Sequence, residues 1–319
     1  MGNRMNRVIV TGATGTIGRA LIKVCVEAGY DVLVIVYRKS TRAEELERLP
    51  HCTVLRMNMD EYSSGLKELE RQGIPMAGYR MFFHLAWEAS FGAGRENLSL
   101  QLRNVEASLD AVQFAKELGC DTFIGAGSQA EYGRTEGVLS ETTPTRPETG
   151  YGITKLCAGQ LTRLACEKLG MRHIWTRILS VYGPFDREET LISTAVNSML
   201  AKDSTSFTPC EQFWDYIYSE DAARAMLLAG EKGESGRIYV IGSGEVHRLR
   251  SYVETIARIT GYTDEIGFGR RPYNDKQVMH LQADISALRE LGFQPEVSFE
   301  QGIEEIVRWK SSRINRSGE

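Results

Sequence analysis

The sequence predicts an α/β fold in which a doubly wound, mostly parallel sheet is followed by a smaller, mostly helical C-terminal lobe. Short runs rich in Val and Ile alternate with amphipathic segments through about the first 180 residues. A glycine-rich stretch follows the first run directly, and after about residue 180 helical patterns joined by irregular, Gly-rich pieces replace the alternation. Strands that are connected by helices run parallel and are covered on both faces, which explains apolar runs without a polar side.

The expected elements follow from this periodicity. Strands are predicted at residues 7–12, 31–37, 52–57, 81–86, 121–127 and 172–178. Segments such as 16–29 and 104–119 carry apolar residues three or four positions apart and end in glycine, which is typical of helices. In the C-terminal part, helices are predicted at 191–202, 251–261, 283–292 and 299–309, and the polar end 311–319 is expected to fray. We place the first domain at 1–178 and the second lobe at 179–319, with part of 212–242 returning to the first domain.

Composition and charge argue against several classes of protein. A net charge of −4 at pH 7, without a dense Lys/Arg block, argues against a nucleic-acid binder. No apolar run approaches the roughly 20 residues that a membrane-spanning helix needs, and the basic N-terminus is followed by too short an apolar run for a signal peptide. The six cysteines form no CxxC pair and have no histidine at metal-ligand spacing. We therefore expect reduced thiols, no metal site and a cytoplasmic protein without a nucleic-acid or membrane partner.

A nucleotide-binding turn is predicted in "VIVTGATGTIGRAL" (8–21), where glycines stand between the first strand and the first helix. Glycine permits a tight turn and a close approach of the backbone to a pyrophosphate, which then meets the positive N-terminus of the helix. The spacing is GxxGxxG rather than the commoner GxGxxG. The residues expected to contact the cofactor here are Gly12, Thr14, Gly15, Thr16 and Ile17, and Gly18 is the third glycine of the pattern.

The second predicted strand indicates which dinucleotide is bound. Folds that bind NAD usually end this strand with an acidic residue, which binds the ribose 2′-hydroxyl. Here that position, near Val36, is apolar, and Asp31 comes too early in the strand. Arg38, Lys39 and Ser40 follow the strand, and a guanidinium with a nearby hydroxyl suits a 2′-phosphate. We therefore expect NADP(H), with NAD(H) possible, because a solvated basic turn would carry the same residues.

A catalytic acid is suggested by "YGITK" (151–155), in which Tyr151 and Lys155 are one helical turn apart and share a face. Transfer of a hydride to a carbonyl leaves an alkoxide that needs a proton. A free tyrosine has a pKa near 10, and a neighbouring ammonium group is expected to lower that pKa. A serine hydroxyl at the end of the fifth strand could orient the carbonyl.

The chain resembles the extended short-chain dehydrogenases/reductases, and more narrowly their nucleotide-sugar epimerase/dehydratase/reductase branch. The resemblance runs nearly end to end, through "TGATGTIG" (11–18), "FFHLAW" (82–87), "NVEASLDAVQFAKELG" (104–119), "GSQAEYG" (127–133), "ETTPTRPETGYGITK" (141–155), "RILSVYGP" (177–184), "WDYIYSEDAARAML" (214–227) and "LGFQPEVSFEQGIEEIVRW" (291–309). It implies that Ser128 is the catalytic serine, Tyr151 the acid/base and Lys155 the residue that holds the nicotinamide ribose. It also implies that further residues line the cofactor, namely Asn58, Met59, Leu85, Ala86, Trp87 and Asn104.

One departure from the family pattern bears on the reaction. The 4,6-dehydratases of this family carry Asp-Glu directly after the catalytic threonine, whereas this chain has Gln129 and Ala130. Glu131 is one position further on, and on an extended segment it would point to the other face. A dehydratase is therefore disfavoured. An NADPH-dependent 4-ketoreductase is preferred, an NAD-dependent 4-epimerase is the alternative, and a non-catalytic NADP-sensing binding protein is a remote third.

The substrate expected from the resemblance is a nucleotide-diphosphate sugar held partly by the second lobe. Its candidate contacts are Gln129, Ala130, Tyr182, Arg187, Trp214 and Arg271, with Phe213 and Arg270 considered beside them. Arg271 could clamp a pyrophosphate, since guanidinium groups bind such anions bidentately. His84, in an apolar strand, is expected to be structural rather than a base. The helices within 92–112 and 154–170 would pair across a homodimer in this family.

Overall fold

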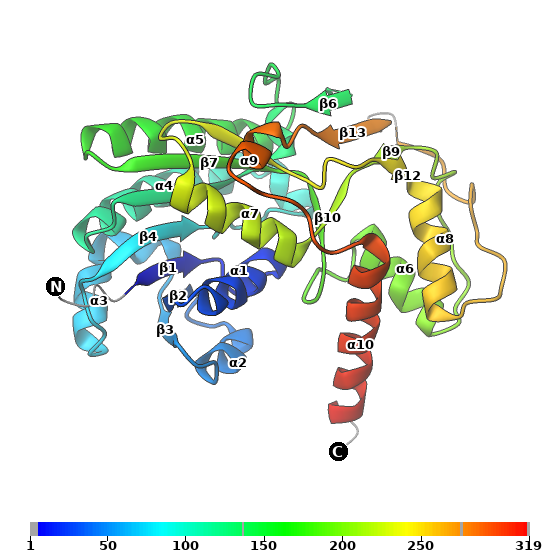
Figure 1. Cartoon of the computed structure of the whole chain (residues 1–319), viewed down its shortest axis with the longest axis horizontal. Helices are drawn as coiled ribbons and strands as arrows, with labels where there is room; N and C mark the ends of the chain where they lie inside the picture. Colours follow the sequence, from blue (N-terminus) through cyan, green and yellow to red (C-terminus); the bar gives the residue numbers. More distant parts are fainter. Residues whose placement is uncertain (1–5, 136, 275–276, 318–319) are drawn as a thin grey trace.

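The central element of the protein is a parallel sheet. The computed structural model describes residues 6–135, 137–274 and 277–317, and within them seven strands pair side by side in the order β3-β2-β1-β4-β5-β7-β11 (Figure 1). Every pairing in this sheet is parallel. The strands are β1 (Arg7–Thr11), β2 (Asp31–Val36), β3 (Cys52–Arg56), β4 (Tyr79–His84), β5 (Thr122–Ser128), β7 (Arg172–Ile178) and β11 (Ile238–Ile241). The predicted fold class is confirmed, and β11 is a further strand that the periodicity did not predict.

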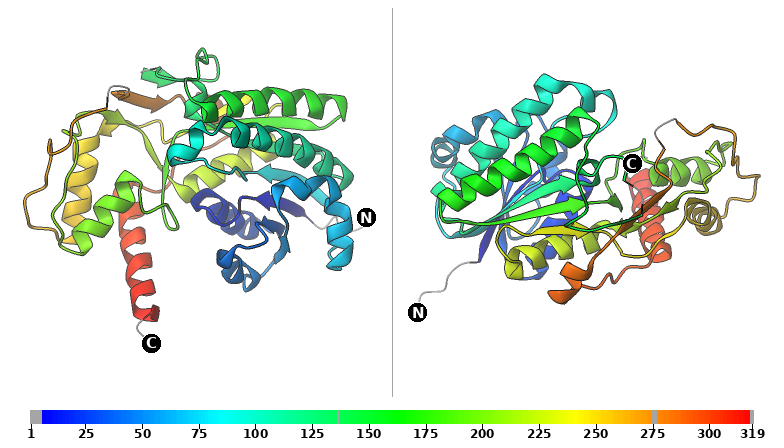
Figure 2. Two further views of the ribbon diagram at one scale, coloured as in Figure 1. Left: turned by 180° about the vertical axis from the view of Figure 1, so that it is seen from behind. Right: turned by 90° about the horizontal axis from the view of Figure 1, so that it is seen from above.

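Helices cover both faces of this sheet, as Figure 2 shows. On one side α1 (Thr16–Glu27) packs beside α7 (Ser219–Lys232), and their apolar residues share a core with Val8 and Val10. On the other side lie α3 (Gly65–Arg71), α4 (Leu98–Glu117) and α5 (Gly150–Lys168), in a core that contains Ile9. Alternate residues of a strand point to opposite faces, so β1 contributes to both cores.

Short elements complete the first domain. Helix α2 (Glu44–Glu47) follows β2, and 3₁₀ turns occur at η1 (Thr41–Ala43), η2 (Met59–Ser64), η3 (Gly92–Glu96) and η4 (Gln129–Glu131). The last two turns lie at the carboxyl ends of β4 and β5, where binding sites of open α/β sheets form.

The second lobe is built on α6 (Leu191–Leu200), α8 (Leu249–Thr260) and α10 (Phe299–Ser317), which share an apolar core. Two small sheets join it to the first domain. One pairs β8 (Ser180–Tyr182) with β10 (Tyr216–Tyr218), and the other contains β12 (His247–Arg248), β9 (Phe213–Trp214), β13 (His280–Ala283) and β6 (Gly137–Leu139). Strand β6, from the first 178 residues, joins a sheet with strands of the second part of the chain. Strand β11, from the second part, joins the seven-stranded parallel sheet.

Two predicted elements differ from the structure. The helix predicted at 283–292 is the end of β13 followed by a short helix, α9 (Ser286–Glu290). The polar end does not fray at 311, because α10 continues to Ser317 and the Arg313 guanidinium pairs with the Glu45 carboxylate. Contacts with distant segments, which no local pattern reveals, accompany both differences: β13 pairs with β6 and β9, and Arg313 pairs with Glu45.

Within the described residues, no helix is both long and apolar enough to span a membrane. The same part of the chain contains no group of three or more His, Cys, Asp or Glu side chains placed to hold a metal ion. All six cysteines are free.

A buried histidine links the two central strands. His84 is 3% exposed, and its two ring nitrogens lie 3.1 Å from the hydroxyls of Thr11 and Ser108. The Ser108 hydroxyl donates to the Asn104 carbonyl and therefore accepts from His84 Nε2. The Thr11 hydroxyl accepts from the N–H groups of Leu85 and Ala86 and therefore donates to His84 Nδ1. The neutral imidazole fits this network, as expected for a structural residue.

Acid should destabilise the fold through this histidine. Burial lowers the pKa of His84 to about 3, whereas an unfolded histidine titrates near 6.5. The unfolded state thus binds more protons below about pH 6.5, and stability is lost as the pH falls from there. We expect His84→Asn to reduce the change in the free energy of unfolding with pH by up to about 1.4 kcal/mol per pH unit. Urea unfolding of the variant and of the wild type between pH 7.5 and 5 measures the slope. Equal slopes for His84→Asn and the wild type would contradict the assignment.

Candidate active site

The glycine-rich turn forms a cradle at the carboxyl end of β1. Gly12 has φ +68°, and a Cβ there would lie 2.6 Å from the Leu85 carbonyl carbon. A Cβ on Gly18 would lie 2.4 Å from the Gly12 carbonyl oxygen, so α1 packs directly on the turn. Gly15 has open space, with its nearest neighbouring atom at 3.6 Å. Two glycines are therefore required by the backbone, and the third leaves room for a ligand.

The N-terminus of α1 faces this space. The N-cap residue is Gly15, which has no side chain to accept from the first N–H groups of the helix, and the first turn contains no acidic residue. The N–H groups of Thr16 and Ile17 and the positive end of the helix dipole are thus available to an anion. Thr14 lies in the same turn and is half-buried. The turn fits the pyrophosphate of a dinucleotide, as the spacing predicts.

The expected 2′-phosphate region is occupied by ion pairs. The Arg38 guanidinium lies 2.8 Å from a Glu61 oxygen and 3.3 Å from a Glu68 oxygen. The side-chain oxygen of Asn58 accepts from the Arg38 N–H, and Met59 begins the turn that carries Glu61. Arg38 is at the predicted place, but two carboxylates compensate its charge.

Ser40 and the loop after β4 complete the cofactor side. The Ser40 carbonyl accepts from Arg56. Leu85 and Ala86 are anchored to Thr11 through their N–H groups. The Asn104 side chain is 2% exposed and bonds to both backbone groups of Glu88. Asn104 therefore holds the loop in place, and its amide is not free to contact the cofactor as the resemblance implied.

The predicted catalytic residues come together at the ends of β5 and α5. Ser128 ends β5, and Tyr151 and Lys155 lie on the first turns of α5, whose N-cap Thr149 accepts from the Gly152 N–H. The Lys155 ammonium donates to the Ala126 carbonyl at 2.7 Å, and it lies 3.7 Å from the Trp87 ring centroid and 5.8 Å from that of Tyr151. The Trp87 ring also meets the Tyr151 ring edge-on.

The pKa of Tyr151 differs from the expectation. Burial raises it, and the opposing effects of the Ser128 hydroxyl and the Arg95 guanidinium are smaller. The prediction that neighbouring charge lowers the pKa of this phenol is thus wrong for the protein alone, because desolvation outweighs it. Burial also lowers the pKa of Lys155 to about 7, with Glu131 acting in the opposite direction. The site holds a neutral phenol beside a lysine that titrates near neutrality.

Some of the predicted substrate residues lie at this site and others do not. Arg187 reaches Ser90, with 3.4 Å between its guanidinium and the serine hydroxyl, and its charge acts on Tyr151. Gln129 and Ala130 begin the turn after Ser128. Ala130 is 8% exposed and its carbonyl packs against Gly152, so its methyl offers little surface to a substrate.

The remaining candidates belong to the second lobe. Tyr182 is 1% exposed and packs on Tyr216 and Phe299, so its prediction as a substrate contact is wrong: burial in the aromatic core uses the ring. Trp214 donates its indole N–H to Ser180. The Arg271 N–H donates to the Phe207 carbonyl, Arg270 pairs with Glu265, and Phe213 stacks on His280. None of these contacts within the described residues joins them to Ser128, Tyr151 or Lys155.

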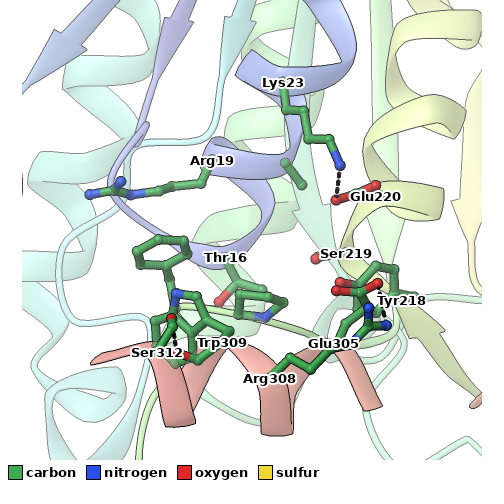
Figure 3. Close-up of a pocket in the computed structure, with 13 residues that line it drawn as sticks. Thr16, Arg19, Lys23, Tyr218, Ser219, Glu220, Glu305, Arg308, Trp309 and Ser312 are labelled. Carbon is green, nitrogen blue, oxygen red and sulfur yellow. Dashed lines mark hydrogen bonds and ion pairs between the residues drawn. The ribbon is translucent and has the colours of Figure 1, made fainter. Parts of the chain in front are cut away.

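A second hollow, of about 390 Å³, lies beside the start of α1 and is closed on one side by α10 (Figure 3). Thr16 and Arg19 line it from α1, and Arg308 and Trp309 line it from α10. Its charges compensate one another, since Lys23 pairs with Glu220 and Arg308 with Glu305. The hollow lies between α10 of the second lobe and α1, and among the described residues its lysine and arginines are each paired with a carboxylate.

Comparison with known proteins identifies the family. The model of the NAD dependent epimerase/dehydratase family matches residues 8–242. The chain belongs to this family. Its fold and its cofactor turn are those of an extended short-chain dehydrogenase/reductase, an NAD(P)-dependent oxidoreductase type that includes epimerases.

Members of the family with different activities resemble this chain over most of its length. A dTDP-4-dehydro-6-deoxyglucose reductase from Escherichia coli is 28% identical over 316 residues, covering 97% of this chain and 98% of the relative. A dTDP-glucose 4,6-dehydratase from the same organism is 25% identical over 97% of this chain and 94% of the relative. The structure of a UDP-N-acetylglucosamine 4-epimerase from Methanobrevibacter ruminantium matches with a TM-score of 0.85 and 23% identity, over 97% of this chain and 99% of the other.

Two residues at the site of this epimerase/dehydratase family member were missed in the sequence. Arg95 lies over the Tyr151 ring, 4.5 Å from its centroid. Gln101 is fully buried and accepts from the Trp87 indole while donating to the carbonyls of Ala89 and Gly94. Glu131, which was expected on an extended segment, lies in a 3₁₀ turn with its carboxylate against the Ser128 N–H, Trp175 and Arg177. A polar residue on the buried face of an expected helix could have indicated Gln101, whereas Arg95 lies in a turn without periodicity.

Proposed function

We propose that the protein reduces a nucleotide-linked 4-keto-6-deoxy sugar with NADPH, with Tyr151 as the proton donor. The observation that carries this proposal is that Ser128 and Lys155 lie at the same site as Tyr151, whose phenol has its pKa raised by burial. A phenol kept neutral is suited to donate a proton. Gln129 and Ala130 stand where a dehydratase needs two acids, and the relative covered almost end to end at 28% identity is a reductase.

Each residue has a distinct part in this reaction. A bound nicotinamide supplies the hydride at the carbonyl carbon. The Ser128 hydroxyl donates to the carbonyl oxygen and orients it, and Tyr151 delivers the proton as the alkoxide forms. Lys155 binds the nicotinamide ribose and, in its ammonium form, stabilises the phenolate that remains. Arg187 and Arg95, neither of which is ion-paired within the described residues, bind oxygen atoms of the nucleotide sugar.

A second candidate is an NAD-dependent 4-epimerase of nucleotide sugars. The observation that favours it is the compensation of Arg38 by Glu61 and Glu68, which makes the 2′-phosphate compete with two carboxylates. Solved structures of 4-epimerases also resemble the chain along its length. A non-catalytic NADP sensor has less support, because such a protein has no need of the assembled serine, tyrosine and lysine.

The reaction is tested by incubating the protein with NADPH and CDP-, GDP- or dTDP-linked 4-keto-6-deoxy sugars and following the loss of NADPH absorbance. We expect one of these sugars to be reduced, and Tyr151→Phe to lower kcat by at least about 100-fold, because the proton donor is lost. Cofactor affinity, measured by fluorescence, should stay within about twofold. Near-wild-type turnover in Tyr151→Phe contradicts the role of the tyrosine. Sugar inversion without NADPH consumption identifies the epimerase instead.

Cofactor preference is tested by equilibrium binding of NADPH and NADH. We expect NADPH to bind more tightly, and Arg38→Asp to weaken NADPH binding by about tenfold or more, since a charged hydrogen bond to phosphate is lost and a repulsion is added. Arg71→Asp is the matched control, because Arg71 pairs with the same Glu68 from an exposed position. Equal affinity of the wild type for the two cofactors removes the support for a reductase.

We further propose that the protein is a homodimer that pairs through α4 and α5. These helices expose large apolar side chains on one surface: Leu98 and Leu102 on α4, and Ile153, Leu161 and Leu164 on α5. Such a patch is typical of a protein interface. Light scattering should give twice the single-chain mass of 35.7 kDa, and Leu102→Glu with Ile153→Glu should give one chain. Leu49→Glu, at an exposed leucine elsewhere, is the control. A wild-type monomer overturns this proposal.

A further inference from the structure

We propose that Glu131 is a positioning residue for the active site, which fixes the turn that presents Ser128 and supplies a buried negative charge that acts on Lys155. The inference rests on the proposed use of Ser128, Tyr151 and Lys155. It concerns a carboxylate that lies beneath these residues rather than one that touches the substrate.

The Glu131 carboxylate is completely buried and surrounded by N–H donors. One oxygen, Oε1, accepts from the Ser128 N–H at 2.8 Å and from the Trp175 indole at 3.1 Å. The other, Oε2, accepts from Arg177 Nε at 2.9 Å and from the same indole at 3.2 Å. These partners come from β5 and β7, on either side of the turn that carries Glu131. All of these contacts are donors, and an ionised carboxylate is the form that accepts from all of them.

The contact with Ser128 orients the hydroxyl. Glu131 and Ser128 form a reciprocal capping box, in which the Ser128 Oγ accepts from the Ala130 N–H at 3.2 Å while Glu131 accepts from the Ser128 N–H. Because the serine oxygen accepts within the turn, its own proton is available to a group in the cleft. The phenol of Tyr151 is such a group, and its pKa is lowered by the Ser128 hydroxyl, against the larger effect of burial. Glu131 thereby sets the position from which Ser128 donates.

The charge of Glu131 acts on Lys155. Lys155 is 4% exposed, and within the described residues its ammonium group contacts the Ala126 carbonyl and the Trp87 ring but no carboxylate. Burial of an ammonium favours the neutral amine, and Glu131 is the carboxylate that opposes this effect. Arg177 shares the same carboxylate, with 4% of its side chain exposed. Without Glu131, the buried Arg177 guanidinium would lose the carboxylate it pairs with, and Lys155 would lose the negative charge that opposes the effect of its burial.

Glu131 also has a structural role, because its loss would leave the buried Arg177 guanidinium without a counter-ion. The hydrogen bond from the Ser128 N–H and the electrostatic effect on Lys155 are separate from this ion pair.

The test separates the charge from the geometry. Glu131→Gln keeps the size and removes the charge, whereas Glu131→Asp keeps the charge and shortens the reach. Glu141→Gln removes a carboxylate from a half-exposed pair with Arg237 and is the matched control. Folding is checked by circular dichroism and cofactor affinity by fluorescence. The titration of Lys155 is followed by NMR of its side chain, assigned with Lys155→Met, and so does not depend on turnover.

In Glu131→Gln we expect the Lys155 titration, and the loss of kcat with rising pH, to move down by about one pH unit, which is a tenfold change in the protonation equilibrium. In Glu131→Asp we expect the titration to stay in place while kcat falls about tenfold and KM changes little, because Ser128 is displaced. Glu141→Gln should match the wild type in both measurements.

An unchanged Lys155 titration in folded Glu131→Gln overturns the inference. So does an equal shift in Glu131→Gln and Glu131→Asp, because the charge would then not be the cause. If Glu131→Gln does not fold, a lysine titration that moves in Glu131→Asp overturns it, and one that stays while kcat falls supports it. Full turnover in Tyr151→Phe is a different result: it rejects the proposed function and leaves the NMR titration as an independent measurement.

Discussion

The active site depends on the close approach of two strand ends, those of β1 and β4. Gly12 lies so near the Leu85–Ala86 peptide that any side chain there would overlap the backbone. Next to it the Thr11 hydroxyl accepts hydrogen bonds from the N–H groups of Leu85 and Ala86 and donates to His84. This contact sets the cofactor turn on one side and the loop that carries Trp87 on the other, and Trp87 in turn lies on Lys155. The contact between β1 and β4 therefore bears on both the glycine cradle and the surroundings of Lys155.

Desolvation is the second constraint on this site, and it acts in opposite directions on the two residues of the YGITK segment. Burial favours the neutral form of both groups, so it raises the pKa of the Tyr151 phenol and lowers the pKa of the Lys155 ammonium group. The protein compensates on the lysine side with a buried carboxylate and on the tyrosine side with guanidinium groups, of which Arg95 lies against the ring. The balance between burial and charge therefore differs between residues that are only one helical turn apart.

Relatives that are named as a reductase, a 4,6-dehydratase and a 4-epimerase all resemble this chain over most of its length. Dehydration needs further acids, which Gln129 and Ala130 do not supply. Reduction and epimerisation differ in whether the oxidised cofactor leaves, so the strength of cofactor binding matters more than the catalytic residues. In this protein the cofactor region around Arg38 is tied to Glu61 and Glu68. At the proposed cofactor site, a 2′-phosphate would therefore compete with two carboxylates for Arg38.

The sequence by itself determined the strands that begin each βα unit and the glycine turn, because these follow from local periodicity and short spacing. It also predicted Ser128, Tyr151 and Lys155 as the site, through the family resemblance and the spacing of YGITK. It did not determine the strand β11, the continuation of α10 or the burial of Tyr182, since each depends on packing against distant segments. The partners of Arg38, Lys155 and Glu131 were decided only by the tertiary structure. A charged side chain takes its pKa and its partner from whatever the fold brings near it, and Glu131 meets Arg177 across 46 residues of sequence.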